Sequence, residues 1–470
     1  MASKATTRRG PGFRCAECGW TTVKWVGRCG ECQAWGSVAE VGTATPRTTP
    51  AAVVVSPALR IGEVDVSHAA ARPTGVGEFD RVLGGGLVAG GVVLLAGEPG
   101  IGKSTLLLDV ASRAARDGRA VLYVSGEEST AQVRARAERI EAMAESLFLA
   151  SETDLATVLG QIEHLEPALV VVDSVQTVAS AEVEGQAGNV TQVREVAASL
   201  IRAAKSRGIA MLLVGHVTKD GSIAGPRVLE HLVDVVLQFE GDRHSRLRIV
   251  RAVKNRFGPT DEVGCFDLSD IGIVGLPDPS GLFLSGRDHA VPGTCVTVTL
   301  EGRRPLVAEL QALVAPSSLP SPRRATSGLD ASRVAMIIAV LDKRAGAPIG
   351  SCDTFAASVG GARITEPAAD LALGLALASS VLDRSLPADV VAFGEVGLAG
   401  EVRRVTGLQR RLSEAARLGF RTAFVPPGSI GEVSQPDGIR LIEVADVEQA
   451  IDVMCRLAAR NVAAASVVNP

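Results

Sequence analysis

The stretch GEPGIGKST, residues 97–105, constrains the fold more than any other part of this chain. It follows an apolar run, GGVVLLA, and precedes an amphipathic stretch that ends at Gly118. A Gly-x4-Gly-Lys-Ser pattern between a strand and a helix is typical of a phosphate-binding loop. Its backbone amides and the amino terminus of the following helix attract phosphate oxygens. The sequence therefore predicts a nucleotide-binding α/β domain.

We expect this loop to bind ATP together with Mg²⁺. Lys103 is predicted to reach the outer phosphates, and the Ser104 hydroxyl to coordinate the metal. A chance match is possible for so short a pattern, but the apolar run before it and the helix after it favour a true phosphate site. The residues assigned to the nucleotide are Gly97, Glu98, Pro99, Gly100, Ile101, Gly102, Lys103, Ser104 and Thr105.

Three further apolar runs, AVLYVSGEES, ALVVVDS and IAMLLVGH, end in polar residues. They are typical of buried parallel strands, and ligands of open α/β sheets lie at the carboxyl ends of such strands. Asp173 is therefore predicted to hold Mg²⁺ through water, and Glu127, or alternatively Glu128, to act as the base that orients the attacking water. A helix cap or a solvated carboxylate is the competing interpretation for each.

Polar stretches follow the predicted strands at two places. His216, with Thr218 and Lys219, fits a sensor that couples the state of the phosphate to a loop. Residues 180–194 and 218–229 are too long and polar for simple turns, and in a ring of six domains they would line the hole where single-stranded DNA runs. Two surface loops without a ligand are the alternative.

The stretch VKNRFG, residues 253–258, carries two cations at the end of a predicted strand, at the lip of the sheet. The sequence offers no cation besides Lys103 near the phosphate loop, and phosphoryl transfer gains from a further cation that is often supplied in trans. We therefore predict that Lys254 and Arg256 act at the nucleotide of a neighbouring subunit. Hydrolysis would then require assembly.

The amino-terminal segment contains two Cys-x-x-Cys pairs ten residues apart. Four thiolates satisfy tetrahedral Zn²⁺ and leave no position for catalysis, which favours a structural zinc site over two disulfides or a redox pair. All three tryptophans, Trp20, Trp25 and Trp35, lie in or beside this module, either as its core or, for one of them, as a surface that stacks on a base. The predicted ligands are Cys15, Cys18, Cys29 and Cys32.

Composition limits the remaining possibilities. Apolar residues make up 46% and charged residues 21% of the chain, as in soluble globular proteins. A formal net charge of -4 gives no overall basic signal, so any contact with DNA must come from a local patch. No run approaches the roughly 20 apolar residues that cross a bilayer, and no signal peptide is evident. We therefore expect a cytoplasmic protein without a membrane partner.

Taken together, the four-cysteine module, GEPGIGKST, VVVDSVQT, GHVTKDGSIAGPRVLEH and KNRFG resemble the RadA (Sms) family of bacterial DNA repair proteins over nearly the whole chain. The resemblance implies a RecA-like ATPase core, a hexameric ring, and a helicase that drives branch migration of recombination intermediates with RecA. Single-stranded and branched DNA are the implied substrates. It also implies that Lys254 and Arg256 belong to a motif that separates this family from RecA.

The carboxyl-terminal part looks like the α+β proteolytic domain of the Lon protease. The nucleophilic serine and the lysine of that protease are replaced here by Ala368 and Gln409, which removes the nucleophile and its base. Thr365 is predicted to cap the first helix of this domain, and Pro367 to lie in its first turn. Its arginines suggest a surface that faces DNA or another subunit, or else solvated side chains: Arg403, Arg404, Arg410, Arg411 and Arg417.

Three classes of function compete: a ring-shaped DNA motor, an ATP-dependent protease, and an ATP-driven switch or kinase of the RecA-like superfamily that does not contact DNA and so does not translocate on it. The absent serine and lysine argue against the protease, and the two polar loops favour the motor. The expected domains are a zinc-finger module at 1–40, a linker at 41–60, a RecA-like ATPase domain at 61–290, a connector and linker at 291–328, and an inactive Lon-protease-like domain at 329–470.

Overall fold

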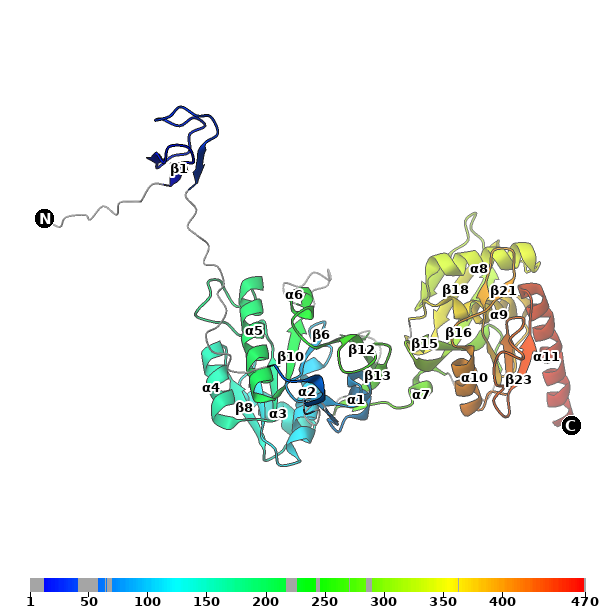
Figure 1. Cartoon of the computed structure of the whole chain (residues 1–470). Coiled ribbons are helices and arrows are strands. Elements are labelled where there is room, and N and C mark those ends of the chain that lie inside the picture. The colour runs from blue at the N-terminus through cyan, green and yellow to red at the C-terminus, as the bar shows by residue number, and fades with distance from the viewer. Residues whose placement is uncertain are drawn as a thin grey trace. The chain divides into compact units, whose positions relative to one another are not determined.

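The computed structural model describes residues 12–40, 58–63, 65, 70–216, 226–241, 246–269, 271–284, 290–361 and 363–468 (Figure 1). The chain divides into two compact units, Met1–Asp65 and Val66–Pro470, each of which is treated by itself. None of the helices described in these ranges has both the length and the apolar character that a bilayer crossing requires.

The smaller unit contains a three-stranded antiparallel sheet, in the order β2-β1-β3. Its small core consists of Cys15, Cys29 and Val38, against which Trp20 packs. Trp25 and Trp35 are exposed instead, by 65% and 77%, so the prediction that the tryptophans form the core holds for Trp20 alone. Its elements are β1 (Phe13–Cys15), β2 (Thr21–Thr22), β3 (Val38–Glu40) and the short helix η1 (Ile61–Glu63).

The larger unit begins with a nine-stranded sheet, in the order β14-β13-β12-β11-β6-β10-β9-β7-β8. Six strands, from β11 to β8 in this order, run parallel, which confirms the predicted parallel α/β sheet. The other three strands, β12, β13 and β14, pair antiparallel and extend the sheet beyond β11. The strands are β6 (Val92–Gly97), β7 (Val121–Ser125), β8 (Leu147–Ser151), β9 (Leu169–Asp173), β10 (Ala210–His216), β11 (Val235–Glu240), β12 (Leu247–Asn255), β13 (Val263–Ser269) and β14 (Gly272–Gly275).

Helices cover both faces of this sheet because its strands are apolar on both sides. Alternate strand residues such as Val93 and Leu95 pack against α1, α2 and α3, whereas Val92 and Leu94 pack against α4 and α5. The helices are α1 (Gly77–Leu83), α2 (Lys103–Ala115), α3 (Thr130–Arg139), α4 (Leu155–Leu165), α5 (Val190–Arg207) and α6 (Pro226–Glu230), and β4 (Ala71–Arg72) pairs with β5 (Leu87–Val88) beside them.

The predicted loop at 180–194 is partly wrong. Its last residues form the start of α5, which Asn189 caps through a hydrogen bond from the amide of Thr191. Gln192 is almost fully buried and its side-chain amide bonds to the backbone of Ser180 and Val183, so the segment folds onto itself. Of the second predicted loop, 218–229, only 226–229 fall in the described residues, where they belong to α6.

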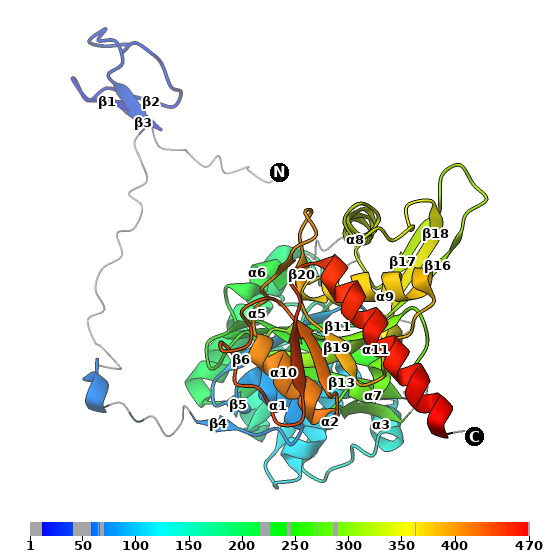
Figure 2. The same ribbon diagram turned by 90° about the vertical axis from the view of Figure 1, so that its right-hand side faces the viewer.

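A seven-stranded sheet, ordered β17-β18-β16-β15-β19-β22-β23, forms the carboxyl-terminal domain. Helices α8, α9 and α11 pack on one face, where Figure 2 shows α11 in red, and α10 packs on the other. The strands are β15 (Thr294–Glu301), β16 (Arg304–Pro316), β17 (Arg324–Ser327), β18 (Cys352–Ser358), β19 (Val390–Ala392), β22 (Thr422–Val425) and β23 (Arg440–Glu443). The helices are α8 (Ala331–Arg344), α9 (Asp370–Leu382), α10 (Leu408–Arg417) and α11 (Val447–Val468).

Shorter elements complete this region: α7 (Ser280–Phe283), the turns η3 (Val359–Gly361) and η4 (Pro367–Ala369), and a hairpin of β20 (Glu395–Val396) and β21 (Val402–Arg403). The expectation of a connector over 291–328 differs from the structure, which makes β15, β16 and β17 from it. Alternation of apolar residues along 294–313 indicates β15 and β16, but it does not extend to β17. The expected cap at Thr365 is also replaced, since Glu366 occupies the cap position of η4.

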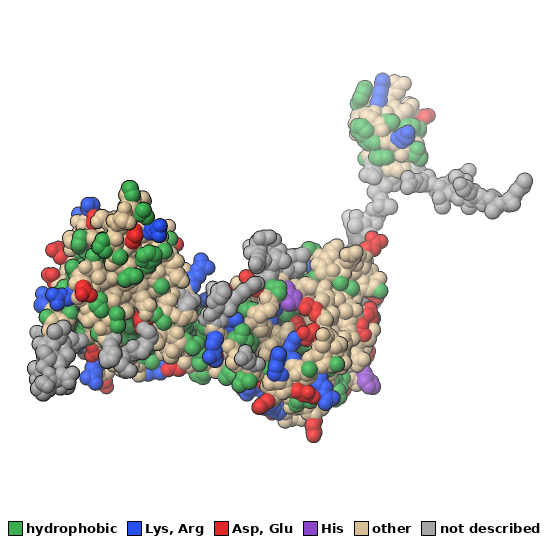
Figure 3. Space-filling model, turned by 180° about the vertical axis from the view of Figure 1, so that it is seen from behind, with side chains coloured by type: hydrophobic (Ala, Val, Ile, Leu, Met, Phe, Trp, Pro, Cys, Tyr) green, Lys and Arg blue, Asp and Glu red, His purple; other side chains and the backbone are tan. Residues whose placement is uncertain are grey.

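The five arginines of the carboxyl-terminal domain do not form one free basic surface. Arg411 is fully buried and bonds to Glu366, because its side chain points into the domain from α10. Arg403, Arg404 and Arg417 are exposed but each pairs with a carboxylate. On the face drawn in Figure 3, Lys and Arg side chains are interspersed with Asp and Glu, in keeping with the small net charge.

Candidate functional site

The phosphate loop connects β6 to α2 and is tightly constrained by its surroundings. Gly100 and Gly102 have φ angles of 77° and 111°, which a side chain would strain. A Cβ atom at Gly97 would lie 2.7 Å from the carbonyl oxygen of Phe239 on the adjacent strand β11. Glycine is therefore required at these positions for the backbone to take this path.

Lys103 lies at the start of α2 with its side chain folded back under the loop. Its Nζ donates hydrogen bonds to the carbonyl oxygens of Gly97, at 2.8 Å, and Glu98, at 2.9 Å. Burial lowers the pKa of Lys103 to about 8, although the carboxylates of Asp173 and Glu127 act in the opposite direction. The amine is thus held by two carbonyl oxygens of the loop itself.

A second cation contacts the loop, contrary to the expectation that Lys103 is alone there. Arg248, on β12, is buried, and its Nε donates to the carbonyl oxygen of Ile101 at 3.3 Å. No local sequence pattern predicts this contact, because 147 residues separate the two positions. Because Arg248 bonds to the loop backbone, it supports the conformation of the loop.

Asp173 ends β9 directly beside the end of β7, with Ser125 as its partner in the sheet. Its carboxylate is mostly buried, and Oδ2 accepts a hydrogen bond of 2.6 Å from the hydroxyl group of Tyr123. Lys103 and Asp173 thus lie at the same carboxyl edge of the parallel strands, as the sequence predicts.

Glu127 and Glu128 differ in their partners, which separates the two candidates for the base. Glu128 pairs with Arg136 of α3 and is engaged in holding that helix. Oε1 of Glu127 instead accepts from the Ser174 hydroxyl at 2.8 Å and lies 3.0 Å from Nε2 of His216. Glu127 remains 46% exposed, at the carboxyl edge of the sheet.

His216 is the last residue of β10 and pairs in register with Gly97 of the phosphate loop. His216 therefore contacts Glu127 through its side chain and lies beside the end of β6, the strand that precedes the phosphate loop. Thr218 and Lys219, the other members of the predicted sensor, lie outside the described residues. Ser174 and Tyr123 also contact these carboxylates, although neither is among the predicted site residues; both lie in the apolar runs ALVVVDS and AVLYVSGEES.

Lys254 and Arg256 lie beside the amino-terminal ends of the parallel strands, whereas the phosphate loop lies at their carboxyl ends. β12 is antiparallel, so Asn255 pairs with Val235 at the start of β11, whereas Phe239 pairs with Gly97. Along β11, Val235 and Phe239 are four residues apart, so Asn255 and Gly97 are offset by about 13 Å in the strand direction. Within one subunit the two cations therefore lie away from the phosphate loop, and their predicted role at the nucleotide of a neighbouring subunit stays a prediction.

Both cations of this motif have partners in their own subunit. Lys254 Nζ donates to the carbonyl oxygens of Glu230, at 2.7 Å, and Val233, at 2.8 Å, just after α6. Arg256 pairs with Asp234 at 3.2 Å. The motif thus fixes the turn that connects α6 to β11.

The four cysteines of the smaller unit converge. Their sulfur atoms all lie within 4.8 Å of one another, and two separations, Cys15–Cys32 and Cys18–Cys29, are 3.7 and 3.6 Å. A disulfide requires about 2.05 Å. Four sulfurs placed about 2.3 Å from a central Zn²⁺ would be about 3.8 Å apart, so the cluster fits a tetrahedral metal site.

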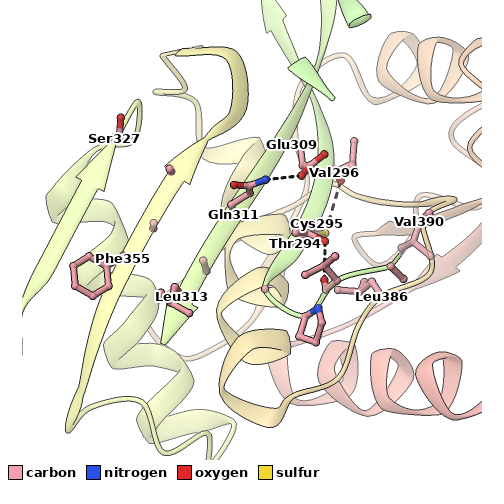
Figure 4. Close-up of a pocket in the computed structure, with 18 of the residues that line it drawn as sticks. Thr294, Cys295, Val296, Glu309, Gln311, Leu313, Ser327, Phe355, Leu386 and Val390 are labelled. Carbon is pink, nitrogen blue, oxygen red and sulfur yellow. Dashed lines mark hydrogen bonds between the residues drawn. The ribbon is translucent and has the colours of Figure 1, made fainter. Parts of the chain in front are cut away.

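The carboxyl-terminal domain lacks the groups of a peptidase at the two positions in question. Ala368 is buried, and the amide nitrogen of Gln409 donates to the carbonyl oxygen of Ser434 at 2.8 Å. A cavity of about 530 Å³ lies elsewhere in this domain, on the sheet face formed by β15, β16 and β18 (Figure 4). Neither Ala368 nor Gln409 lines it.

Comparison with known protein families finds matches to three separate segments of the chain. Residues 13–40 match the rubredoxin metal binding domain, residues 56–222 match an AAA domain, and residues 360–457 match the Lon protease (S16) C-terminal proteolytic domain. These matches agree with the predicted combination of a P-loop ATPase domain, a four-cysteine module and a Lon-protease-like domain.

Several curated proteins are similar over almost their whole length. The chain is 55% identical over 460 residues to the DNA repair protein RadA of Mycolicibacterium smegmatis, covering 95% of this chain and 97% of the relative. It is 54% identical to the protein of that name from Mycobacterium tuberculosis H37Rv, covering 95% and 93%, and 44% identical to that of Bacillus subtilis, covering 93% and 97%. The chain therefore belongs to the family of the DNA repair protein RadA.

Proposed function

We propose that the chain is a DNA-dependent ATPase that works as a branch-migration helicase in recombinational DNA repair, together with RecA. The convergence of Lys103, Asp173 and Glu127 at one edge of a parallel sheet carries this proposal, because phosphoryl transfer needs phosphate binding, a metal ligand and a base at one place. A motor on chromosomal DNA is expected to work in the cytoplasm.

The residues of this edge have distinct roles in the proposed reaction. The loop 97–105 binds the phosphates of ATP, while Ser104 and Asp173 hold Mg²⁺, which neutralises charge on the phosphate oxygens. Glu127 is the base: Ser174 and His216 contact its Oε1, so we assign Oε2 to the attacking water. His216 would pass the state of the phosphate to the segment after β10.

A second subunit completes the proposed site. Lys254 and Arg256 are about 13 Å of strand away from their own phosphate loop, so a role at a phosphate is open to them only in a neighbour. If each subunit supplies these cations to the next one, the subunits form a closed ring. We propose six copies in this ring. Zn²⁺ on the four thiolates would hold the amino-terminal module in shape, and single-stranded and branched DNA are the proposed substrates.

Peptide cleavage is not part of the proposal. Ala368 offers no nucleophile, and the amide of Gln409 cannot act as a base at the position of the lysine. The carboxyl-terminal domain is instead proposed as a scaffold for assembly.

The experiment that tests the proposal measures ATP turnover with and without single-stranded DNA over a range of protein concentrations. We expect turnover to rise with DNA, and to rise per subunit with concentration as rings form. The alternative function is an ATP-driven switch without DNA translocation. Turnover that ignores DNA, from a protein that demonstrably forms rings, would favour the switch.

A further inference from the structure

Tyr123 is the one tyrosine in the chain, and its hydroxyl group contacts Asp173 of the proposed nucleotide site from the core of the domain. It stands in the middle of β7, opposite Val171 of β9, and its ring packs in the core beneath α2 and α3. Its hydroxyl group donates a 2.6 Å hydrogen bond to Oδ2 of Asp173. The side chain of Tyr123 is 1% exposed, so this contact is closed to water.

A phenylalanine would fill the same space in the core without a polar atom. Burying a hydroxyl group costs free energy unless the group is hydrogen bonded, so packing alone does not favour tyrosine here. The hydroxyl group of Tyr123 has such a partner, because it donates to Oδ2 of Asp173.

The hydrogen bond gives the two carboxylate oxygens of Asp173 different partners, because Oδ2 accepts from Tyr123. A donor that is fixed in the core engages Oδ2 and limits rotation of the carboxylate, which directs Oδ1 to the metal side. Hydrogen bonds to a charged acceptor are stronger than those between neutral groups, so the restraint is substantial. Arg136 and Glu128, the other charged groups near Tyr123, are engaged with each other.

We propose that Tyr123 is a positioning residue that holds the Asp173 carboxylate in the orientation required for Mg²⁺ and so sets the magnesium dependence of nucleotide binding. The proposal rests on the proposed ATPase function. It assigns to a core residue a role that a purely structural tyrosine would not have.

The test compares wild-type protein with Tyr123→Phe, using the full chain and a fluorescent ADP analogue whose anisotropy reports binding. MgCl2 is titrated from an EDTA-containing start. We expect the half-saturating Mg²⁺ concentration to rise about tenfold in the variant, as for the loss of one hydrogen bond to a charged group. Binding of the analogue in EDTA should stay as in the wild type, because the phosphate loop is intact.

Ser112→Ala is the matched control. Ser112 also carries a buried hydroxyl group in this domain, on α2, and its Oγ makes no hydrogen bond with the described residues. The control should keep the wild-type magnesium titration. An unchanged titration in Tyr123→Phe would overturn the proposal while leaving the ATPase function in place, whereas a wild-type protein that binds no nucleotide would overturn both.

A second measurement covers the case in which Tyr123→Phe does not fold. Because the chain has a single tyrosine, incorporation of 3-fluorotyrosine gives one ¹⁹F resonance. We expect this resonance to move when MgCl2 is added to the protein with saturating ADP, and to remain in place when Mg²⁺ is added without nucleotide. A resonance that ignores Mg²⁺ in the presence of ADP would contradict the proposed role.

Discussion

Nη1 of Arg256 lies 3.2 Å from Oδ1 of Asp234, a carboxylate that is almost fully buried at the start of β11. The same carboxylate accepts from the amide of Val92 and from Lys205. Arg256 is itself 56% exposed, so its guanidinium group can change partner while Asp234 stays paired. The exposure of Arg256 supports its proposed role at the nucleotide of a neighbouring subunit.

Arg256→Ala should therefore leave nucleotide binding intact and abolish ATP turnover, whereas Lys103→Ala should abolish binding. Mixed rings of the two inactive variants should recover part of the turnover, because some sites would combine an intact loop with an intact Arg256. Lys205→Ala is the matched control, since it removes the other cation from Asp234. It should keep turnover within about twofold, because Lys205 is exposed and Asp234 keeps Arg256 and the amide of Val92 as partners. Mixed rings that form but show no recovery would contradict the role in trans.

The amino-terminal module gives a second prediction. Cys29→Ser should release the metal, because three thiolates do not complete a tetrahedral site and metal binding provides the folding free energy of such small modules. Metal content by mass spectrometry should fall from one Zn²⁺ per chain to a small fraction, and Trp20 fluorescence should shift toward that of exposed tryptophan. Cys352→Ser, outside the cluster, should keep the metal. Full zinc content in Cys29→Ser would refute the four-thiolate site.

The pKa of Lys103 gives a third prediction. Since burial lowers this pKa to about 8 and bound phosphate favours the charged form, nucleotide binding should take up protons near pH 8, and affinity should fall as the pH rises above 8. The free energy of unfolding changes with pH in the opposite direction to the nucleotide affinity. Between pH 8 and 10.5 the Lys103 side chain is protonated in the unfolded chain but largely deprotonated in the native one. The contribution of Lys103 to the free energy of unfolding therefore rises with pH.

Calorimetry in two buffers of different ionisation enthalpy measures the proton uptake directly. Lys103→Met, which keeps the length of the side chain, should show weak binding without linked protons. Equal heats in the two buffers for the wild type at pH 8 would exclude the lowered pKa.

Much of the fold follows from local sequence. The phosphate loop, the apolar strands before Asp173 and His216, and the helix 408–417 are encoded by short patterns whose physical meaning does not depend on the rest of the chain. Polar residues at the carboxyl ends of parallel strands are expected to lie together, and this expectation is sufficient to predict that Lys103 and Asp173 are neighbours.

The remaining features depend on distant contacts. Antiparallel β12 turns Lys254 and Arg256 away from the edge where the phosphate loop lies, and a strand gives no local sign of its direction. Arg248 meets Ile101 only through the sheet. Segment 294–316 is predicted to belong to a connector, because a stretch rich in proline and serine follows it. In the structure it instead supplies the long hairpin β15–β16 to the domain after it.

Arg411 is the clearest case of a long-range effect and gives the last prediction. Its charged neighbours in sequence favoured a surface position, but Nη1 and Nη2 donate to Glu366 at 2.6 and 2.7 Å, and Nη1 also donates to the carbonyl oxygen of Val298. Arg411→Ala would leave the Glu366 carboxylate without its ion-pair partner and create a cavity. We expect it to lower the free energy of unfolding of the carboxyl-terminal domain by about 3–5 kcal/mol.

Arg410→Ala is the control, because Arg410 is the adjacent residue of α10 and is exposed. It should change the free energy of unfolding by less than about 0.5 kcal/mol. Urea unfolding, followed by circular dichroism, measures both. If the arginines of this helix served mainly to contact DNA, Arg410→Ala would weaken DNA binding and Arg411→Ala would leave stability unchanged. The buried ion pair predicts the reverse for Arg411, since its loss removes a tie between α10 and the segment that precedes η4.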